Sequence, residues 1–397
     1  MLEHRAVTIV GAGIAGLALA RALAHLDADV TVLEQAPEIS EVGAGLQITP
    51  NGARVLAALG LGEEAAEIGL ASTAVELRNG ETGQRVLRMG LDGAGDFRFF
   101  HRADLIEMLL LGAAQAGVTI RTNARVQKVK LGDHPPRLTL EGGEVIEPAL
   151  LIGADGLHSK VRSALNGAVA PFFTHQVAWR ATLRETSDIE PIAQIWMGAG
   201  RHIVTYPLRG GRLRNIVAVE ERRTWADESW SLTDDPMTLR VAFQDFVPEV
   251  QGWLKRVEAP NLWGLFRHPV AGRWQGQGAA ILGDAAHPTL PFLAQGANMA
   301  LEDAWVLAEC LRRMPIDEAL PTYQSLRETR ARRIVEAANT NARNYHLKGM
   351  VRGAAHLALR LGGSLMPTAP LRRFDWLYGH DVIAQMAEAL STEQEAG

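Results

Sequence analysis

The sequence is poor in the residues that mark several common protein classes. Its 397 residues include one cysteine, Cys310, and aromatic side chains make up 6% of the chain. A single cysteine excludes a disulfide within the chain, which fits a reducing compartment, and its helical, apolar setting favours a small buried residue over a nucleophile. No uninterrupted apolar run reaches the roughly 18 residues of a membrane-spanning helix. We therefore expect a cytoplasmic protein without a membrane partner.

The chain also lacks an excess of basic residues and any metal-binding pattern. The formal net charge is −5 at pH 7, and the arginines are scattered rather than gathered in one tract. This charge gives no reason to expect nucleic acid or an anionic membrane as a partner. The sequence has no His-Glu-x-x-His run, no cluster of Cys and His and no Asp-rich loop. We therefore expect no metal ion.

What the chain does have is a strand–turn–helix signature near its start. The β-branched run at 7–10 predicts a buried strand, which breaks into the turn Gly-Ala-Gly-Ile-Ala-Gly and then an Ala/Leu-rich helical pattern. Gly11 allows the tight turn, Gly13 lets a pyrophosphate approach the backbone, and Gly16 lets helix and strand pack closely. Phosphates would then sit at the N-terminus of the helix.

A second predicted strand, 29–33, completes this signature because it ends at Glu34. The Glu34 carboxylate is placed to accept hydrogen bonds from an adenosine ribose. The alternative is a glycine-rich turn in an ordinary α/β unit. The full strand–turn–helix–strand context favours a dinucleotide site.

The pattern along the chain predicts an α/β unit that an inserted sheet interrupts. Between about 171 and 275 helical patterns nearly vanish, and successive strand candidates predict an antiparallel sheet with one helix near 239–246. The α/β pattern returns at 279–288, and two long helices follow at about 297–311 and 320–344. The predicted parts are a discontinuous dinucleotide-binding domain (1–72, 98–170 and 276–345), a substrate domain (73–97 and 171–275) and a C-terminal helical segment (346–397).

Four stretches in this order resemble one enzyme family. They are the glycine turn with Glu34, Arg102, Gly-Ala-Asp-Gly at 153–156, and Gly-Asp-Ala-Ala-His-Pro at 283–288. Together they resemble the flavin-dependent aromatic hydroxylases, the single-component (group A) monooxygenases, which include salicylate hydroxylase, 3-hydroxybenzoate 6-hydroxylase and 6-hydroxynicotinate 3-monooxygenase. The resemblance implies a mixed α/β (α+β) fold like that of p-hydroxybenzoate hydroxylase: a Rossmann-like FAD-binding domain, an inserted antiparallel-sheet substrate domain and C-terminal helices.

The resemblance also implies the cofactors. FAD would be held non-covalently, and NADH or NADPH would donate electrons transiently without a Rossmann unit of its own. The sequence agrees, because no second Gly-x-Gly-x-x-Gly follows a strand and no Cys-x-x-Cys pair is present. Both would be expected in a disulfide-reductase type of flavoprotein.

The residues that the resemblance implies for FAD are spread over the chain. They are Gly11, Gly13, Ala15, Gly16 and Glu34 for the ADP half, Val126 for adenine, Arg102 for the pyrophosphate side, Asp155 for FAD and nicotinamide, Asp284 for the ribityl chain, and Pro291, Gly296, Ala297 and Asn298 for the flavin. Three alternatives stay open: a surface ion pair for Arg102, a plain turn at Asp155, and a cap of the next turn for Asp284. We interpret His287, in the same turn as Asp284, as structural.

Two residues of the inserted sheet are candidates for the chemistry. His202 and Tyr206 are four apart on a predicted strand, so they share one face with Cα atoms roughly 13 Å apart. The resemblance implies that both line the substrate pocket. A histidine with its ordinary pKa, about 6.5, could accept a phenolic proton near neutral pH. The alternative is a sheet histidine and a core tyrosine with structural roles.

Three further residues are candidates for substrate contact. Gln47 stands where the resemblance implies a pocket residue, and Arg180 offers a cation for a substrate carboxylate, although a surface arginine at a strand edge is the alternative. Phe292 departs from several relatives, which have a polar residue there. This departure suggests a more apolar pocket wall and leaves the substrate's identity open.

The implied reaction is hydroxylation of a phenolic or N-heteroaromatic acid. In the family, NAD(P)H reduces FAD, O₂ adds to form a flavin C4a-hydroperoxide, and the aromatic ring attacks its distal oxygen. The alternatives are a quinone-precursor hydroxylase or epoxidase with a more apolar substrate, and a flavin-binding protein without turnover. A monomer and a homodimer are both compatible with the sequence.

Overall fold

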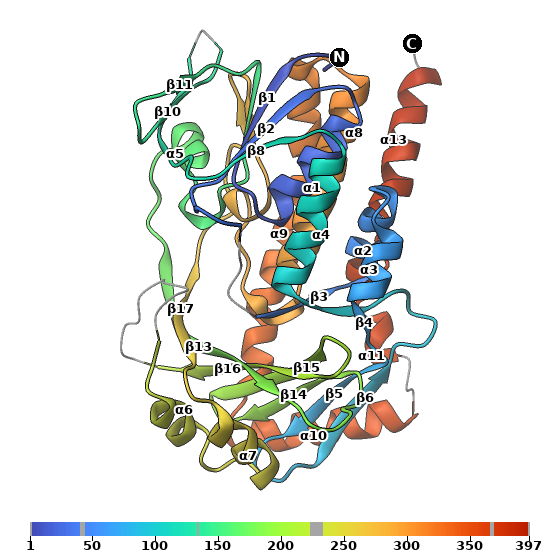
Figure 1. The fold of residues 1–397 in the computed structure, drawn as a ribbon. Coiled ribbons are helices and arrows are strands. Elements are labelled where there is room, and N and C mark those ends of the chain that lie inside the picture. Colours follow the sequence, from blue (N-terminus) through green and yellow to red (C-terminus); the bar gives the residue numbers. More distant parts are fainter. Residues whose placement is uncertain (1, 40–43, 133–134, 223–232, 366–368, 396–397) are drawn as a thin grey trace.

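The computed structural model describes residues 2–39, 44–132, 135–222, 233–365 and 369–395. Two large sheets lie at opposite ends of an elongated molecule, and long helices run along the first sheet toward the second (Figure 1). Within the described ranges, none of the helices combines the length and apolarity needed to traverse a bilayer. The mixed α/β architecture confirms the predicted fold class.

The first sheet carries the predicted N-terminal signature. Its order is β18-β19-β12-β1-β2-β8, and all neighbouring strands are parallel except β18 and β19. Its central strands are aliphatic and almost wholly buried, as expected for parallel strands covered on both faces. The bounds are β1 (Ala6–Val10), β2 (Asp29–Leu33), β8 (Thr119–Arg121), β12 (Leu150–Gly153), β18 (Gln275–Gly276) and β19 (Ala279–Ile281).

A layer of four helices packs beside this sheet. They are α1 (Ile14–Ala24), α4 (Arg102–Gln115), α8 (Gly296–Arg313) and α9 (Ile316–Tyr345). Helix α1 lies against both α4 and α8, and most of its residues are buried. Helices α8 and α9 confirm the two long helices predicted from the sequence, with slightly wider bounds.

The second sheet has the order β17-β13-β16-β15-β14-β5-β6. The predicted antiparallel arrangement is wrong for one pair, because β14 and β5 run parallel. Strand β5 comes from a distant part of the chain, so no hairpin forces it to be antiparallel to β14. The bounds are β5 (Ala74–Asn79), β6 (Arg85–Gly90), β13 (Phe172–Arg184), β14 (Ile192–Gly198), β15 (Arg201–Leu208), β16 (Leu213–Glu221) and β17 (Asn261–Arg267).

Two helices, and not the single one predicted near 239–246, cover one face of this sheet. Helix α6 (Pro236–Ala242) ends before the predicted helix does, and α7 (Pro248–Arg256) begins after it. Proline fits the first turn of a helix but restrains the residue before it to extended backbone, and Val247 is extended. The two helices pack on a core that contains Trp179 and Trp196.

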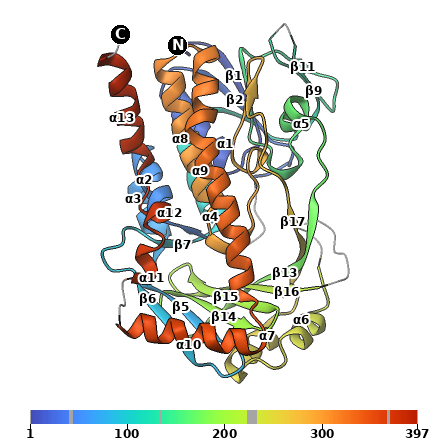
Figure 2. The same ribbon diagram turned by 180° about the vertical axis from the view of Figure 1, so that it is seen from behind.

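Smaller elements connect the two sheets. Figure 2 shows the C-terminal helices, with α10 beside β5 and β6 and α13 beside α2. The remaining bounds are β3 (Gly45–Ile48), β4 (Leu70–Ala71), β7 (Arg98–His101), β9 (Val126–Lys130), β10 (Arg137–Leu140), β11 (Val145–Ile146), α2 (Pro50–Ala58), α3 (Gly62–Ile68), α5 (Lys160–Asn166), α10 (Gly349–Leu365), α11 (Ala369–Arg372), α12 (Asp375–Tyr378), α13 (Val382–Glu395) and three 3₁₀ turns, η1 (Gly156–His158), η2 (Gly283–Ala285) and η3 (Pro291–Leu293).

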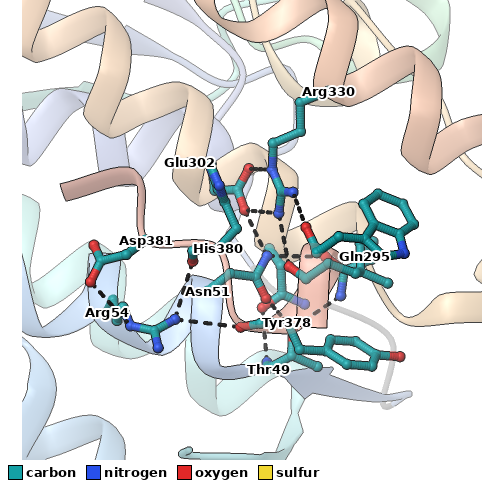
Figure 3. Close-up of polar contacts among 12 residues, drawn as sticks. Thr49, Asn51, Arg54, Gln295, Glu302, Arg330, Tyr378, His380 and Asp381 are labelled. Atoms are coloured by element: carbon teal, nitrogen blue, oxygen red, sulfur yellow. Dashed lines mark hydrogen bonds and ion pairs between the residues drawn. The ribbon is translucent and has the colours of Figure 1, made fainter. Parts of the chain in front are cut away.

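A buried ionic cluster joins α8 to α9. Arg327 lies 2.7 Å from a Glu302 oxygen and 2.8 Å from an Asp303 oxygen, and all three side chains are buried. Arg330 binds Glu302 at 2.8 Å and donates to the carbonyls of Trp376 and of the next residue (Figure 3). Burial alone would raise the pKa of Glu302, but the two arginines outweigh it and hold that pKa well below its usual value. The cluster therefore fastens the C-terminal segment to the helical layer.

Replacing Arg330 tests this cluster. We expect Arg330→Met to lower the free energy of unfolding by about 3 kcal/mol, because a buried carboxylate and two carbonyls lose a partner. Arg332→Met is the matched control on the same helix: its pair with Glu328 is half exposed, so its loss should cost less than about 1 kcal/mol. Urea unfolding of both variants measures the difference. Equal midpoints for the two variants would show that the cluster adds no stability.

Candidate active site

Three of the four sequence motifs meet at one edge of the first sheet, where four strands end. In the parallel register Val10 lies opposite Leu33 and Gly153, and Gly153 lies opposite Ile281. The carboxyl ends of these four strands therefore point the same way, toward the crevice where open α/β sheets bind their ligands. The motif residues that follow the strand ends are Gly11, Glu34, Asp155 and Asp284.

Close backbone contacts explain the glycines of the first motif. Gly11 has φ +103°, and a Cβ there would lie 2.4 Å from the carbonyl oxygen of Ala154. A Cβ on Gly16 would lie 2.0 Å from the carbonyl oxygen of Gly11. At Gly283 a Cβ would lie 3.1 Å from the Cβ of Ala15. The turn after β19 therefore packs on the helix that follows β1.

Gly13 differs from these glycines because nothing lies within 4 Å of the position of its Cβ. It is the N-cap of α1, so the first N–H groups of that helix, which have no partner within the helix, lie beside this open side. Unpaired N–H groups and the helix dipole favour an anion there. The local structure therefore fits the pyrophosphate site that the sequence predicts.

Glu34 is held by the backbone on both sides. Its two carboxylate oxygens accept the N–H groups of Ala12 at 3.0 Å and Ala36 at 2.9 Å. Each oxygen keeps a lone pair that can accept a ribose hydroxyl. Ala124 donates its N–H to the carbonyl of Glu34, which brings Val126, at the start of β9, into the same neighbourhood.

Asp284 and Arg102 come from distant motifs and act on each other electrostatically. Asp284 is exposed, although the residues on either side of it are buried. Desolvation by the surrounding protein nevertheless raises the pKa of Asp284, and the charges of His287 and then of Arg102 partly offset this rise.

Asp155 uses its side chain locally. Its carboxylate accepts hydrogen bonds from the Ser159 hydroxyl at 2.5 Å and from the N–H of Lys160 at 2.7 Å. Burial raises the pKa of Asp155, and these bonds work against that rise. The side chain therefore organises the turn before α5, and a part in cofactor binding stays a prediction.

The N-terminus of α8 adjoins β3. The Asn298 amide accepts the N–H of Thr49 at 2.9 Å and donates to the carbonyl of Gln47 at 3.1 Å. These bonds commit the side chain to joining β3 and α8. A ligand at this helix end would therefore meet the backbone N–H groups of Gly296 and Ala297, just after the 3₁₀ turn that Pro291 begins.

A network of buried hydrogen bonds also fixes the loop before this helix end. Gln295 donates to the hydroxyl of Thr49 at 3.0 Å, and Asn51 donates to the Gln295 carbonyl oxygen at 3.1 Å. Asn51 also donates to Glu302 at 2.7 Å, which connects the network to the ionic cluster (Figure 3). The loop before α8 is thus fixed by buried polar groups.

The predicted strand with His202 and Tyr206 on one face is β15 of the second sheet. The ring of Tyr206 stacks on Phe99 with centroids 4.9 Å apart, and a Cβ on Gly45 would lie 2.6 Å from the Tyr206 ring. Asn215, opposite Tyr206 on β16, accepts the N–H of Gly45 at 2.8 Å. Ile203, on the other face, packs into the core beneath α6 and α7. Strand β3 therefore lies on the face that carries His202 and Tyr206.

His202 is enclosed by aromatic rings. The centroid of its ring lies 5.7 Å from that of Phe292 and 5.1 Å from that of Tyr345. Phe292 is held in place by Asn341, which donates to its carbonyl at 2.9 Å and also contacts the Tyr345 hydroxyl. The residue that departs from relatives thus forms an apolar wall beside the candidate base.

Arg180 does not lie at a sheet edge, so that alternative is wrong. Strand β13 is flanked by β16 and β17, and the guanidinium stacks 4.3 Å above the ring of Trp263. Burial raises the pKa of Tyr206, and the charge of Arg180 works against this rise. The Arg180 side chain therefore lies on the sheet face that carries His202 and Tyr206.

Comparison with known proteins gives the family. The FAD binding domain family matches residues 4–338. A 3-hydroxybenzoate 6-hydroxylase of Aquipseudomonas alcaligenes is 34% identical over 402 aligned residues, which cover 96% of this chain and 99% of that protein. The chain belongs to the flavin-dependent aromatic hydroxylases.

Two further matches extend this result. A 3-amino-4-hydroxybenzoate 2-monooxygenase of Streptomyces cremeus is 35% identical, with 86% of this chain and 88% of that protein covered. The crystal structure of Klebsiella pneumoniae HpxO complexed with FAD and uric acid aligns with a TM-score of 0.81 at 25% identity, over 92% of this chain and 95% of that one. As a flavin-dependent aromatic hydroxylase, this protein is a flavoprotein monooxygenase. The position of FAD in the strand-end crevice stays a prediction.

Three residues beside His202 and Tyr206 were not singled out from the sequence. Asn215 and Tyr345 adjoin Tyr206 and His202, respectively, and His346 contacts His202 directly. The sequence does show a tyrosine followed by a histidine at the end of a long predicted helix. Nothing in the sequence indicates, however, that this helix end reaches β15.

Gly13→Ala tests the pyrophosphate position in this hydroxylase. The added Cβ meets no protein atom within 4 Å, so the apoprotein should keep its melting temperature. Crowding of the phosphate should weaken FAD binding by about tenfold, or ~1.4 kcal/mol. Flavin titration of the apoprotein measures this, with Gly142→Ala as the control, because Gly142 also has open space at its Cβ. Wild-type FAD affinity in Gly13→Ala would place the pyrophosphate elsewhere.

Proposed function

We propose that this enzyme hydroxylates a phenolic carboxylic acid, using NADH or NADPH and O₂. The observation that carries the proposal is the enclosure of His202 between Phe292 and Tyr345. Strand β3 contacts this face of the sheet and is also hydrogen-bonded to the start of α8. The two relatives described above, which are named as acting on hydroxybenzoates, support this substrate class. Bound FAD supplies the activated oxygen.

His202 is the proposed proton acceptor. Burial, together with the neighbouring His346, holds the pKa of His202 well below its usual value. The imidazole is therefore neutral at physiological pH, and its unprotonated nitrogen can accept a proton. Removing the phenolic proton makes the ring more electron-rich, which favours its attack on the oxygen.

The other residues would position the ring and exclude water. Arg180 is the proposed partner of the substrate carboxylate, because a guanidinium binds a carboxylate through paired hydrogen bonds. Tyr206 on β15 and Gln47 on β3 would line the same region. Phe292 and Tyr345 shield His202, and this apolar wall protects the reacting oxygen from water.

Turnover with candidate acids tests the proposal directly. The purified protein should show a flavin spectrum, and hydroxybenzoates and aminohydroxybenzoates should stimulate NADH or NADPH oxidation with hydroxylated product. Product and H₂O₂ are measured together. Faster oxidation that yields only H₂O₂ with every acid would contradict hydroxylation of this substrate class.

His202→Gln tests the proton acceptor. Hydroxylation should slow by about 10²- to 10⁴-fold, the usual contribution of a positioned base, while FAD stays bound. His356→Gln, a buried histidine on α10, is the control and should leave the rate unchanged. In the wild type the rate should stay level as the pH falls to 6.5, because the lowered pKa of His202 keeps it neutral. An unchanged rate in His202→Gln would rule out this role.

A further inference from the structure

A pair of buried histidines lies behind the proposed pocket. Nδ1 of His202 is 2.7 Å from Nε2 of His346. The two residues are 1% and 4% exposed, and they come from β15 and from the residue just after α9. Among the described residues, Nε2 of His202 forms no hydrogen bond, so this nitrogen is the one available to a substrate.

The contacts continue from His346 to the surface. Nδ1 of His346 lies 3.2 Å from an oxygen of Glu221, whose side chain is 40% exposed. The other Glu221 oxygen binds the Lys348 ammonium at 2.6 Å. The amide of Gln176 also approaches Nδ1 of His346, at 3.4 Å. An unbroken line of titratable groups thus connects the buried His202 with solvent.

The chemistry at the surface end fixes the direction of these bonds. The shorter contact of His346 Nδ1 is with Glu221, at 3.2 Å, against 3.4 Å for the amide nitrogen of Gln176. An ionised carboxylate only accepts hydrogen bonds, so we assign the proton to Nδ1 of His346, as a donor to Glu221. Nε2 of His346 then has a lone pair and accepts from Nδ1–H of His202. His202 is left with its lone pair on Nε2, the nitrogen that is available to a substrate.

We propose that His346 and Glu221 form a relay that carries protons from His202 to solvent. The relay rests on the proposed function, in which His202 accepts the phenolic proton. The phenol O–H bond breaks as Nε2–H of His202 forms; Nδ1–H of His202 breaks as Nε2–H of His346 forms; and Nδ1 of His346 passes its proton through Glu221 to water. No electrons are exchanged, and the reverse transfer resets the network when the product leaves.

Burial makes such an outlet necessary. Desolvation disfavours a charged His202, and the aromatic rings of Phe292 and Tyr345 offer no counter-charge. Burial also lowers the pKa of His346 and Lys348 adds to this, while Glu221 raises it. A proton on His202 is therefore held weakly. Burial would raise the pKa of Glu221, but Lys348 and His346 outweigh it and lower that pKa, so Glu221 passes a proton on to water. His346 and Glu221 act through His202, so they are positioning residues rather than catalytic ones.

Exchange of the imidazole N–H protons with water tests the relay without turnover. In the FAD-loaded, ¹⁵N-histidine-labelled protein, NMR should show both rings protonated at Nδ1. His346→Gln should slow exchange at His202 by about 100-fold, the order of a lost acid–base group. Glu221→Gln should slow it as well and lower the pKa of His346, whereas Glu221→Asp should restore part of the rate.

Glu220→Gln is the matched control, because Glu220 precedes Glu221 on β16 and pairs with Arg222 instead. It should leave exchange at His202 and the pKa of His346 unchanged. Wild-type exchange in a folded His346→Gln would overturn the relay. Hydroxylation assays keep this result separate from the proposed function: a rate loss in His202→Gln with none in His346→Gln refutes the relay alone, and no hydroxylation of any acid refutes the proposed function alone.

Discussion

The pairing of Arg327 with Glu302 and Asp303 is the interaction on which the rest of the structure depends. One buried guanidinium holds two consecutive carboxylates of α8. Asp303 in turn accepts the N–H of Gly283 at 2.9 Å and lies 2.5 Å from Nε2 of His287, so it fixes the turn that presents Asp284. Removing one partner would leave a buried charge uncompensated, which is far costlier than losing a surface pair.

The same helix, α8, connects the first sheet with the second. Glu302 reaches Asn51 and the loop before α8, whereas Asn298, one turn earlier, is tied to β3. Strand β3 then reaches the second sheet through the bond from Gly45 to Asn215. The candidate flavin edge and the candidate base therefore sit on one continuous polar framework, which limits how far they can move apart.

The sequence predicted those features that short-range chemistry decides. The glycine turn, the strand that ends at Glu34, the helices after 296 and the alternation of His202 and Tyr206 each follow from spacing within a few residues. The errors lay where distant segments meet. The direction of β5 against β14 and the interior place of Arg180 depend on strands far apart in the chain. Helix α7, which begins at Pro248, was not predicted, although proline fits the first turn of a helix.

By itself, the sequence predicted a dinucleotide at Gly11–Gly16 and, through its motifs, identified the family to which the chain belongs. Only the tertiary structure decided what surrounds the candidate base. Tyr345 and His346 lie more than a hundred residues after His202, and no local pattern encodes their approach. The approach follows from the length and direction of α9, which the buried ionic cluster fixes against α8. Local spacing sets which groups are available, and long-range packing sets which of them touch.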